Sequence, residues 1–343
     1  MRIAVLGAGA WGTALAIAFA RRHAVTLWAR DPNQVELMAA QRENARYLKD
    51  CPFPDELKLQ ADYRKAIANA ELLVIASPLS GLRDSLLQLR DAKLATPFLW
   101  VCKGLEANTG LLPHQVVAEV LGDHASCGVL TGPSFALELA QGLPTVVTLA
   151  STDEVFALAI AKQLHGGNLR VYATDDVIGA EIGGAVKNVM AIATGISDGM
   201  NLGANCRAAL LTRGLAEITR FGVTLGGKAE TFTGLSGMGD LFLTCTGDLS
   251  RNRRVGLLLA TGMSIPDIKL QLGQVAEGVP AAREVARRAD ELGVYMPITQ
   301  VVCAIVEGRM TAEHGLQFMM SSEAGAENDP SALFLAAAAQ KPS

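Results

Sequence analysis

The chain has 343 residues, of which 50% are hydrophobic, and it carries 30 basic and 34 acidic side chains for a formal net charge of −4. This length exceeds what one hydrophobic core usually organises, so we expect two domains. The charge argues against a nucleic-acid-binding protein, and the six cysteines and five histidines are too scattered to predict a metal site. Because the apolar runs are shorter than the ~20 residues that span a bilayer, we expect a cytoplasmic protein without stable membrane insertion.

The first half alternates short apolar runs with segments long enough for a helix, and beyond Asp175 helical periodicity takes over. Apolar strands separated by helices predict a parallel sheet covered on both faces. We therefore expect an α/β doubly wound sheet over 1–180, an all-helical domain over 181–330 and a flexible tail over 331–343. The predicted strands are 2–7, 24–29, 71–77, 97–102, 126–131 and 145–150, with a further short one at 169–173.

A glycine-rich turn follows the first predicted strand, with Gly7, Gly9 and Gly12 in G-x-G-x-x-G spacing before a predicted helix. The first glycine permits a tight turn, the second lets the backbone approach a pyrophosphate, and the third lets the helix pack on the strand. The pyrophosphate would meet the N–H groups at the helix start, where the helix dipole favours an anion. In this context the motif predicts a Rossmann-type dinucleotide-binding domain.

The end of the second predicted strand bears on the choice between NAD and NADP. An acidic residue there can hold the ribose 2′-hydroxyl of NAD, whereas an arginine can pair with the 2′-phosphate of NADP. The chain has Arg30 followed by Asp31. Arg30 slightly favours NADP, but it can also be a plain solvated charge, and Asp31 leaves NAD open.

Two further strand ends carry polar residues, and ligands of a doubly wound sheet bind outside the carboxyl ends of its strands. Lys103 directly follows an apolar strand, where a lysine rarely lies without a partner, so we expect either a ligand or a structural ion pair. Gly132 and Ser134 follow the next strand and can offer backbone and hydroxyl donors, although Gly-Pro-Ser is also an ordinary turn.

The second domain begins with a predicted long helix that carries a lysine among small residues. Gly183 and Gly184 lie one turn before Lys187 on the same helical face. Each glycine inside a helix costs about 1 kcal/mol relative to alanine, which suggests that another body approaches this face closely. Helix packing would explain the glycines but not the lysine. Burial or a cationic neighbour would lower the lysine's pKa and suit it to proton transfer, so we predict a catalytic Lys187.

A basic cluster over 250–254 allows three interpretations: a solvated helix start, a nucleic-acid patch or a site for a small anion. A serine before a polar run that becomes apolar is typical of a helix N-cap. Such a helix start offers N–H groups, a hydroxyl, a guanidinium and an amide to one dianion, so we favour a phosphate site. The predicted phosphate-binding residues are Ser250, Arg251 and Asn252, with Arg253 and Arg254 facing solvent.

Taken together, these stretches resemble the NAD(P)-dependent glycerol-3-phosphate dehydrogenase family of the bacterial type. The resemblance runs from "GAGAWGTALA" through "KGLE", "GPSFALELAQGLPT", "GGAVKNVMAIATGISDG" and "TFTGLSGMGDLFLTCTGDLSRNRRVG" to "EGVPAAREV". It implies a reversible NAD(P)H-dependent reduction of dihydroxyacetone phosphate to sn-glycerol 3-phosphate, which feeds glycerophospholipid synthesis. We expect a homodimer. Its substrate would be this small phosphorylated triose, bound in the helical domain.

The resemblance also implies roles for individual residues. Lys187 would be the acid/base residue at the substrate carbinol, with Asp240 beside it, and Lys103 would contact both substrate and cofactor. The remaining substrate-binding residues would be Gly132, Ser134, Ser250, Arg251 and Asn252. Beyond the three glycines, the cofactor-binding residues would be Ala10, Trp11, Arg30, Lys103, Ala136, Arg251, Val275 and Glu277.

Two other functions fit parts of the pattern. A β-hydroxyacid dehydrogenase shares both domains and an interdomain lysine. That family, however, carries the pattern K-x-x-x-N on its catalytic helix. Here the residue four after Lys187 is Ala191, and the asparagine is adjacent at Asn188. A non-catalytic dinucleotide sensor has no need of an acid/base lysine. The phosphate site and the lysine therefore favour the glycerol-3-phosphate dehydrogenase interpretation.

Overall fold

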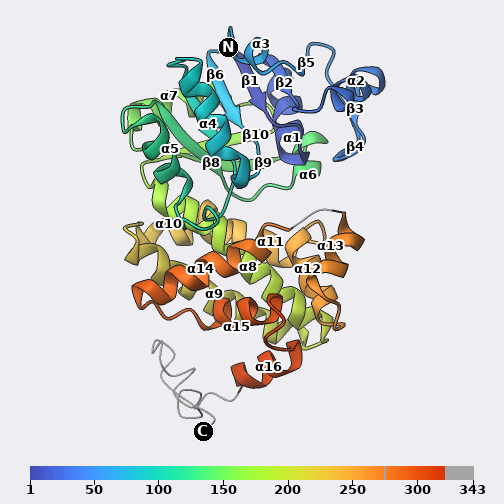
Figure 1. Ribbon diagram of the computed structural model, residues 1–343, viewed down its shortest axis with the longest axis vertical. Helices are drawn as coiled ribbons and strands as arrows, with labels where there is room; N and C mark the ends of the chain where they lie inside the picture. Colours follow the sequence, from blue (N-terminus) through green and yellow to red (C-terminus); the bar gives the residue numbers. More distant parts are fainter. Residues whose placement is uncertain (274–275, 321–343) are drawn as a thin grey trace. The chain divides into compact units, whose positions relative to one another are not determined.

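The computed structural model describes residues 1–273 and 276–320, and these form two compact units (Figure 1). The sheet unit comprises Met1–Glu106 and Leu111–Glu181, and the helical unit comprises Ala107–Gly110 and the described residues from Ile182 onward. The predicted tail over 331–343 lies outside the described residues.

Within the described residues of the sheet unit, eight strands form one sheet in the order β10-β9-β8-β7-β6-β1-β2-β5. All seven predicted strands are present, and short β5 at the edge was not predicted. The chain adds β2 on one side of β1 and later adds β6 on its other side. This reversal of the strand order at β1 is the topological switch point of a doubly wound sheet. The strands are β1 (Arg2–Leu6), β2 (Ala24–Trp28), β5 (Lys58–Gln60), β6 (Leu72–Ile75), β7 (Phe98–Trp100), β8 (Cys127–Thr131), β9 (Thr145–Ala150) and β10 (Leu169–Thr174).

The expectation of a fully parallel sheet is wrong at one place, because β9 runs antiparallel to β8. The segment between them contains only the five-residue helix α6 (Ala136–Ala140). Parallel neighbours are usually joined through a crossover helix that packs on the sheet, and this connection carries a single short helix. An antiparallel pair needs no such crossover. The pairs that carry the predicted nucleotide site are parallel, namely β1 with β2, β1 with β6, β6 with β7 and β7 with β8.

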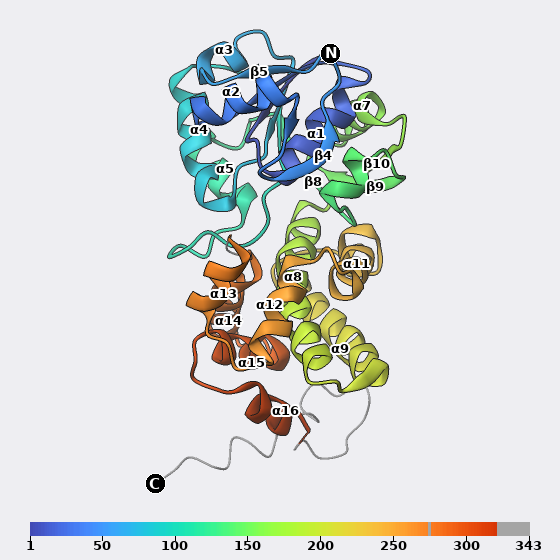
Figure 2. The same ribbon diagram turned by 90° about the vertical axis from the view of Figure 1, so that its right-hand side faces the viewer.

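Helices cover both faces of the sheet, which explains why its strands are apolar throughout (Figures 1 and 2). Successive residues of β1 point to opposite faces: Ile3 and Val5 join one core, and Ala4 and Leu6 the other. The first core includes residues of α1 (Ala10–Ala20) and α7 (Glu154–Leu164), and the second includes residues of α4 (Leu82–Asp91) and α5 (Pro113–Leu121).

A small separate hairpin interrupts this pattern after α2 (Pro32–Gln41). It consists of β3 (Glu43–Asn44) and β4 (Leu48–Pro52), which pair antiparallel. A further short helix, α3 (Tyr63–Ile67), follows β5. The hairpin was not predicted, because its strands are short and lack an alternating apolar pattern.

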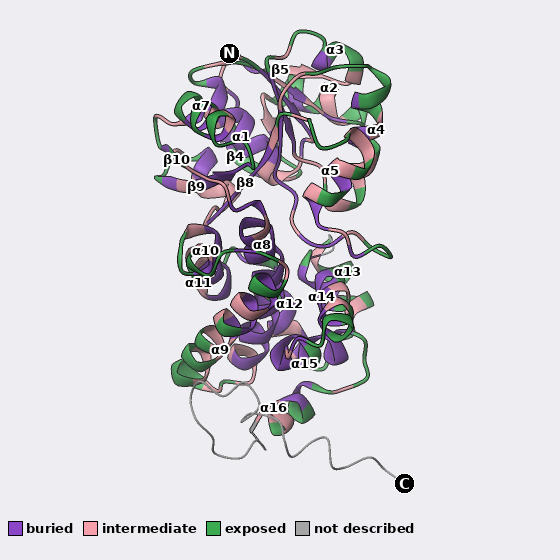
Figure 3. Cartoon of the chain, turned by 90° about the vertical axis from the view of Figure 1, so that its left-hand side faces the viewer, coloured by how far each residue is buried: buried purple, intermediate pink, exposed green. Residues whose placement is uncertain are grey.

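The helical unit is organised around α8 (Val177–Gly199), which begins in the sheet unit. Asp176, just before this helix, accepts a hydrogen bond from the Gly179 N–H at 2.8 Å and so caps its first turn. By length and composition α8 could cross a membrane, but 94% of its apolar window is buried inside the protein, as in a core helix (Figure 3). The other helices are α9 (Gly203–Thr224), α10 (Ala229–Thr233), α11 (Asp240–Thr246), α12 (Arg251–Leu259), α13 (Ile265–Leu272), α14 (Gly278–Leu292), α15 (Pro297–Val306) and α16 (Ala312–Met320), with a π-helical turn at Leu235–Gly239.

A buried glutamate fixes the first turns of α8 within the sheet unit. Glu181 accepts hydrogen bonds from Trp100 Nε1 and the His114 N–H, both at 2.9 Å, and its second oxygen lies 2.5 Å from His114 Nδ1. Burial raises the pKa of this carboxyl, while the contacts with His114 and Trp100 oppose the shift. Glu181 therefore ties the first turns of α8 to β7 and α5 within the sheet unit.

Candidate active site

The three glycines of the loop after β1 differ in the atoms that surround them. Gly7 has φ +129°, and a Cβ there would lie 2.7 Å from the Ala76 carbonyl oxygen. A Cβ on Gly12 would lie 2.0 Å from the Gly7 oxygen, so α1 packs on the loop at backbone distance. A Cβ on Gly9 would meet no atom of the described residues within 4 Å. The loop therefore leaves open space at its second glycine only.

The start of α1 lies directly beside this open space. Gly9 is the N-cap residue, and no side chain of the described residues caps the helix. The first N–H groups of a helix have no partner within the helix, and they attract anions. Ala10 and Trp11 are half-buried, with Trp11 packed against the core of the sheet unit. The residues of this loop fit a dinucleotide pyrophosphate.

The other predicted residues of the sheet unit follow the carboxyl ends of β2, β7 and β8. Arg30 is exposed beyond β2. Asp31 accepts a hydrogen bond from the Asn33 N–H at 3.0 Å and so caps α2, which gives this carboxylate a structural role. Lys103 is half-buried beyond β7. At the end of β8, the Ser134 hydroxyl donates to the Gly132 carbonyl at 2.9 Å, and the half-buried Ala136 begins α6.

In the helical unit, Lys187 is 7% exposed and lies against Asp240, which is 1% exposed. Lys187 Nζ donates to Asp240 Oδ1 in a short contact and to Thr244 Oγ1 at 2.9 Å. The Thr244 hydroxyl donates to the main-chain carbonyl of Asp240 at 2.6 Å, so it accepts from the lysine. We call Lys187, Asp240 and Thr244 the lysine triad. Thr244 was not predicted, although it stands four residues after Asp240 and hence on the same helical face.

Close backbone packing brings the two parts of the lysine triad together. A Cβ on Gly183 would lie 2.2 Å from the Ser236 carbonyl oxygen, so the turn Leu235–Gly239 rests directly on α8. Asp240 is the first residue after that turn. The prediction that another body approaches this face of α8 is confirmed at Gly183.

At the start of α12, Ser250 is the N-cap residue and accepts from the Arg253 N–H at 3.2 Å, as predicted. Arg251 is exposed. Asn252 is buried: its Nδ2 donates to Asn188 Oδ1 and its Oδ1 accepts from the Gly278 N–H, both at 2.9 Å. An amide nitrogen has two hydrogens, so the contact with Asn188 uses one of them.

The expectation that Arg253 faces solvent is wrong. Its side chain is 12% exposed and donates to Asp198 at the end of α8 and to Asp248 before α12, both at 2.8 Å. A Cβ on Gly195 would lie 2.1 Å from the Arg253 carbonyl oxygen. Because α12 packs backbone to backbone on α8, residue 253 faces that helix. Arg254 is exposed, as expected.

One remaining predicted residue lies at the start of α14. Glu277 is exposed and is the N-cap residue of that helix. Val275 lies outside the described residues. Within residues 1–273 and 276–320, no group of three or more His, Cys, Asp or Glu side chains could hold a metal ion.

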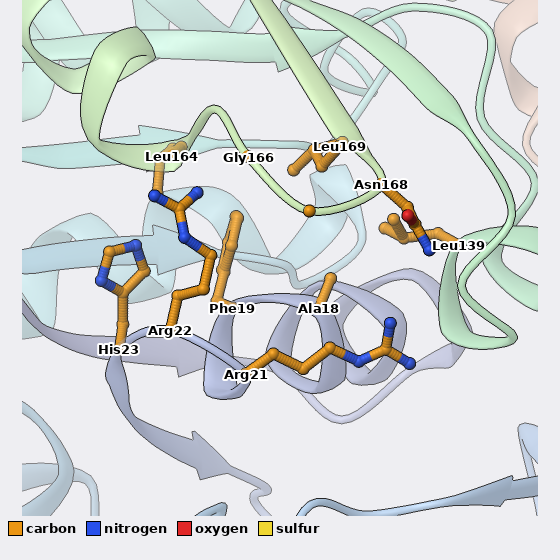
Figure 4. A pocket seen from close by; sticks show the side chains of 11 residues that line it. Ala18, Phe19, Arg21, Arg22, His23, Leu139, Leu164, Gly166, Asn168 and Leu169 are labelled. Atoms are coloured by element: carbon orange, nitrogen blue, oxygen red, sulfur yellow. The ribbon is translucent and has the colours of Figure 1, made fainter.

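The sheet unit also contains a pocket outside the predicted site (Figure 4). None of the predicted site residues lines it. It lies between the end of α1 and the segment before β10. Arg22 donates to the His165 carbonyl at 2.6 Å, and Arg21 donates to the Ala140 carbonyl at 3.4 Å. These two arginines therefore hold the carboxyl ends of α7 and α6, which is a structural use.

Comparison with known proteins agrees with this division of the chain. Family models for the N-terminus and the C-terminus of NAD-dependent glycerol-3-phosphate dehydrogenase match residues 2–157 and 176–317. Glycerol-3-phosphate dehydrogenase [NAD(P)+] of Dechloromonas aromatica is 55% identical over 94% of this chain and 98% of its own length. The enzyme of the same name from Thiobacillus denitrificans is 56% identical over 95% of this chain and 100% of its own.

A solved structure supports the same relationship. The crystal structure of glycerol-3-phosphate dehydrogenase from Coxiella burnetii matches with a TM-score of 0.89 and 41% identity, over 93% of this chain and 98% of that one. The sheet unit and the helical unit thus recur in a relative whose fold is known. This chain belongs to the NAD-dependent glycerol-3-phosphate dehydrogenase family and is an oxidoreductase.

Proposed function

We propose that this chain catalyses the reversible NAD(P)H-dependent reduction of dihydroxyacetone phosphate to sn-glycerol 3-phosphate, with Lys187 as the acid/base group. The observation that carries this proposal is the buried lysine triad in a member of this family. A nicotinamide cofactor, when bound, would supply a hydride to C2 of the substrate. The C2 oxygen must then take up one proton, and a positioned ammonium group is suited to donate it.

Asp240 and Thr244 serve this proton transfer. Burying an ammonium group is costly unless a counter-charge and hydrogen bonds compensate it. Asp240 supplies the counter-charge, and Thr244 fixes the direction of the ammonium group through its hydroxyl. In the reductive direction Lys187 gives its proton to the C2 oxygen and regains one from solvent, and in the oxidative direction the neutral amine accepts the carbinol proton.

The substrate phosphate is assigned to the start of α12. The exposed guanidinium of Arg251 and the N-terminal end of the helix dipole both favour a dianion. Ser250 and Asn252 are buried, which gives their side chains fixed positions. Binding energy from this non-reacting phosphate would orient the carbonyl for reaction.

The dinucleotide is assigned to the glycine loop and the start of α1. The open space beside Gly9 supports this assignment. Arg30 can pair with a 2′-phosphate and so slightly favours NADP, whereas Asp31 next to it caps α2. Lys103, Gly132, Ser134 and Ala136 at the strand ends and Glu277 before α14 stay predictions from the sequence.

The substitution Lys187→Ala tests the proposed acid/base role. We expect turnover to fall about 10³-fold, the usual size of a general acid contribution, with NADPH affinity unchanged within about twofold. Because the variant leaves the Asp240 carboxylate buried without its cation, the double variant Lys187→Ala/Asp240→Asn should regain thermal stability but not turnover. The control is Lys269→Ala, which removes an exposed lysine of the helical unit. Full turnover in Lys187→Ala would refute the assignment.

A further inference from the structure

The unpredicted hairpin β3–β4 places a buried asparagine against the glycine loop. Asn44 is 1% exposed, and its Nδ2 donates to the Ala8 carbonyl oxygen at 2.9 Å and to Thr13 Oγ1 at 2.8 Å. Ala8 lies between the first two glycines of the loop, and Thr13 lies in the first turns of α1. One side chain from outside the motif therefore holds both the loop and the helix that follows it.

The orientation of this amide follows from its partners. A carbonyl oxygen only accepts hydrogen bonds, so the atom that faces Ala8 must be the nitrogen of Asn44. Both hydrogens of that nitrogen are used. Asn44 Oδ1 is buried and has no hydrogen-bond partner among the described residues. Burying an unsatisfied oxygen costs free energy, so Asn44 contributes to this site through its two donors.

Holding the Ala8 carbonyl also sets the direction of the next N–H group. The described residues contain no cis peptide bond, and in a trans peptide the C=O and N–H groups point to opposite sides. The Ala8 carbonyl points to the hairpin, so the Gly9 N–H points away from it. Gln34 of α2 donates to the same carbonyl at 3.2 Å and supports the same orientation.

We propose that Asn44 is a positioning residue for the dinucleotide: it fixes the Ala8–Gly9 peptide so that the N–H groups of the loop and of α1 face the pyrophosphate. This inference rests on the proposed dinucleotide binding at the glycine loop. It predicts that Asn44 affects the affinity for the cofactor but neither kcat nor the KM for the triose.

The test uses the full chain and the substitution Asn44→Asp, which keeps the shape of the side chain but places an acceptor against the Ala8 carbonyl. The dissociation constants of NADPH and NADH are measured without triose, and kcat and KM for dihydroxyacetone phosphate at saturating cofactor. We expect both dissociation constants to rise about tenfold or more, and kcat and the triose KM to stay within about twofold. Asn44→Ser retains one donor, so its dissociation constants for NADPH and NADH should rise less. This variant replaces Asn44→Asp in the test if Asn44→Asp does not fold.

The matched control is Glu43→Ala, which removes a contact within the hairpin, from the Asp50 N–H to Glu43 at 3.2 Å, without touching the loop. Its dissociation constants should stay within about twofold of those of the unmodified chain. Unchanged cofactor affinity in folded Asn44 variants, or an equal rise in Glu43→Ala, would overturn the positioning role. If the unmodified chain bound neither NADPH nor NADH, the proposed function itself would fail.

Discussion

The glycine loop of the sheet unit and the lysine triad of the helical unit are suited to ligands in opposite ways. The loop offers main-chain N–H groups beside space that no side chain of the described residues fills at Gly9. The triad offers a charged side chain that a buried carboxylate and a hydroxyl hold in place. An added methyl group should therefore damage the first region, whereas a lost charge or hydrogen bond should damage the second.

Alanine substitutions at two glycines test this contrast most strongly. Gly12→Ala should destabilise the fold by about 3 kcal/mol or more, because its Cβ would lie 2.0 Å from the Gly7 oxygen. Gly9→Ala should leave the free energy of unfolding within about 0.5 kcal/mol but weaken NADPH binding about tenfold or more. Urea denaturation and cofactor titration give the two quantities. Equal cofactor affinity in Gly9→Ala and the unmodified chain would show that the open space is not the pyrophosphate site.

A second buried carboxyl group of the helical unit, Glu217, has partners that join two helices. Glu217 accepts hydrogen bonds from the Ile298 N–H at 2.7 Å, from the Thr299 N–H at 3.2 Å and from the Thr299 hydroxyl at 3.1 Å. It thereby joins α9 to the start of α15. Burial raises the pKa of Glu217 to about 7, against the opposing effect of these hydrogen bonds.

The pH dependence of stability follows from that shift. Because the pKa is higher in the folded state than in the unfolded one, the stabilisation is complete below about pH 4.5 and is lost as the pH rises through about 7. Glu217→Gln should remove this dependence, which is on the order of 3 kcal/mol, from urea denaturation measured across that pH range. Glu230→Gln, at an exposed glutamate, is the control. Identical pH profiles of Glu217→Gln and the unmodified chain would contradict the assignment.

A smaller effect is expected at the start of α12, where the ligand contact is a side chain at the surface. Arg251→Ala should raise KM for dihydroxyacetone phosphate about tenfold to a hundredfold, as expected for one charge-assisted hydrogen bond, with kcat less affected. Arg254→Ala removes another exposed arginine of the same helix and should change KM less than about twofold. Initial rates at saturating NADPH measure both. An equal KM in Arg251→Ala and the unmodified chain would exclude the phosphate-binding role.

The same contrast explains how much the sequence could predict. The glycine loop is local: strand, turn and helix follow one another within 20 residues, so spacing alone indicates the geometry. The contact between Lys187 and Asp240 joins residues 53 apart and depends on the packing of Gly183 against Ser236. Sequence reasoning could identify the lysine as unusual and could infer close packing, but Thr244 became evident only from the folded helix.

Three features escaped prediction for related reasons. The hairpin that carries Asn44 has short polar strands, which leave no periodic signal. The reversal of β9 left no signal in the sequence, because a connection of this length could serve either strand direction. Arg253 was expected to face solvent, whereas its burial follows from the close contact of α12 with Gly195 of α8. At Arg253, tertiary packing outweighs local residue type.

The central claim is most directly tested by initial rates of NADPH oxidation with the unmodified chain. Dihydroxyacetone phosphate is compared with unphosphorylated dihydroxyacetone and with a panel of 2- and 3-keto acids, and each is repeated with NADH. We expect turnover with dihydroxyacetone phosphate and a kcat/KM about 10³-fold lower without the phosphate, because that group supplies the remote binding energy. Turnover with keto acids and none with dihydroxyacetone phosphate would contradict the account.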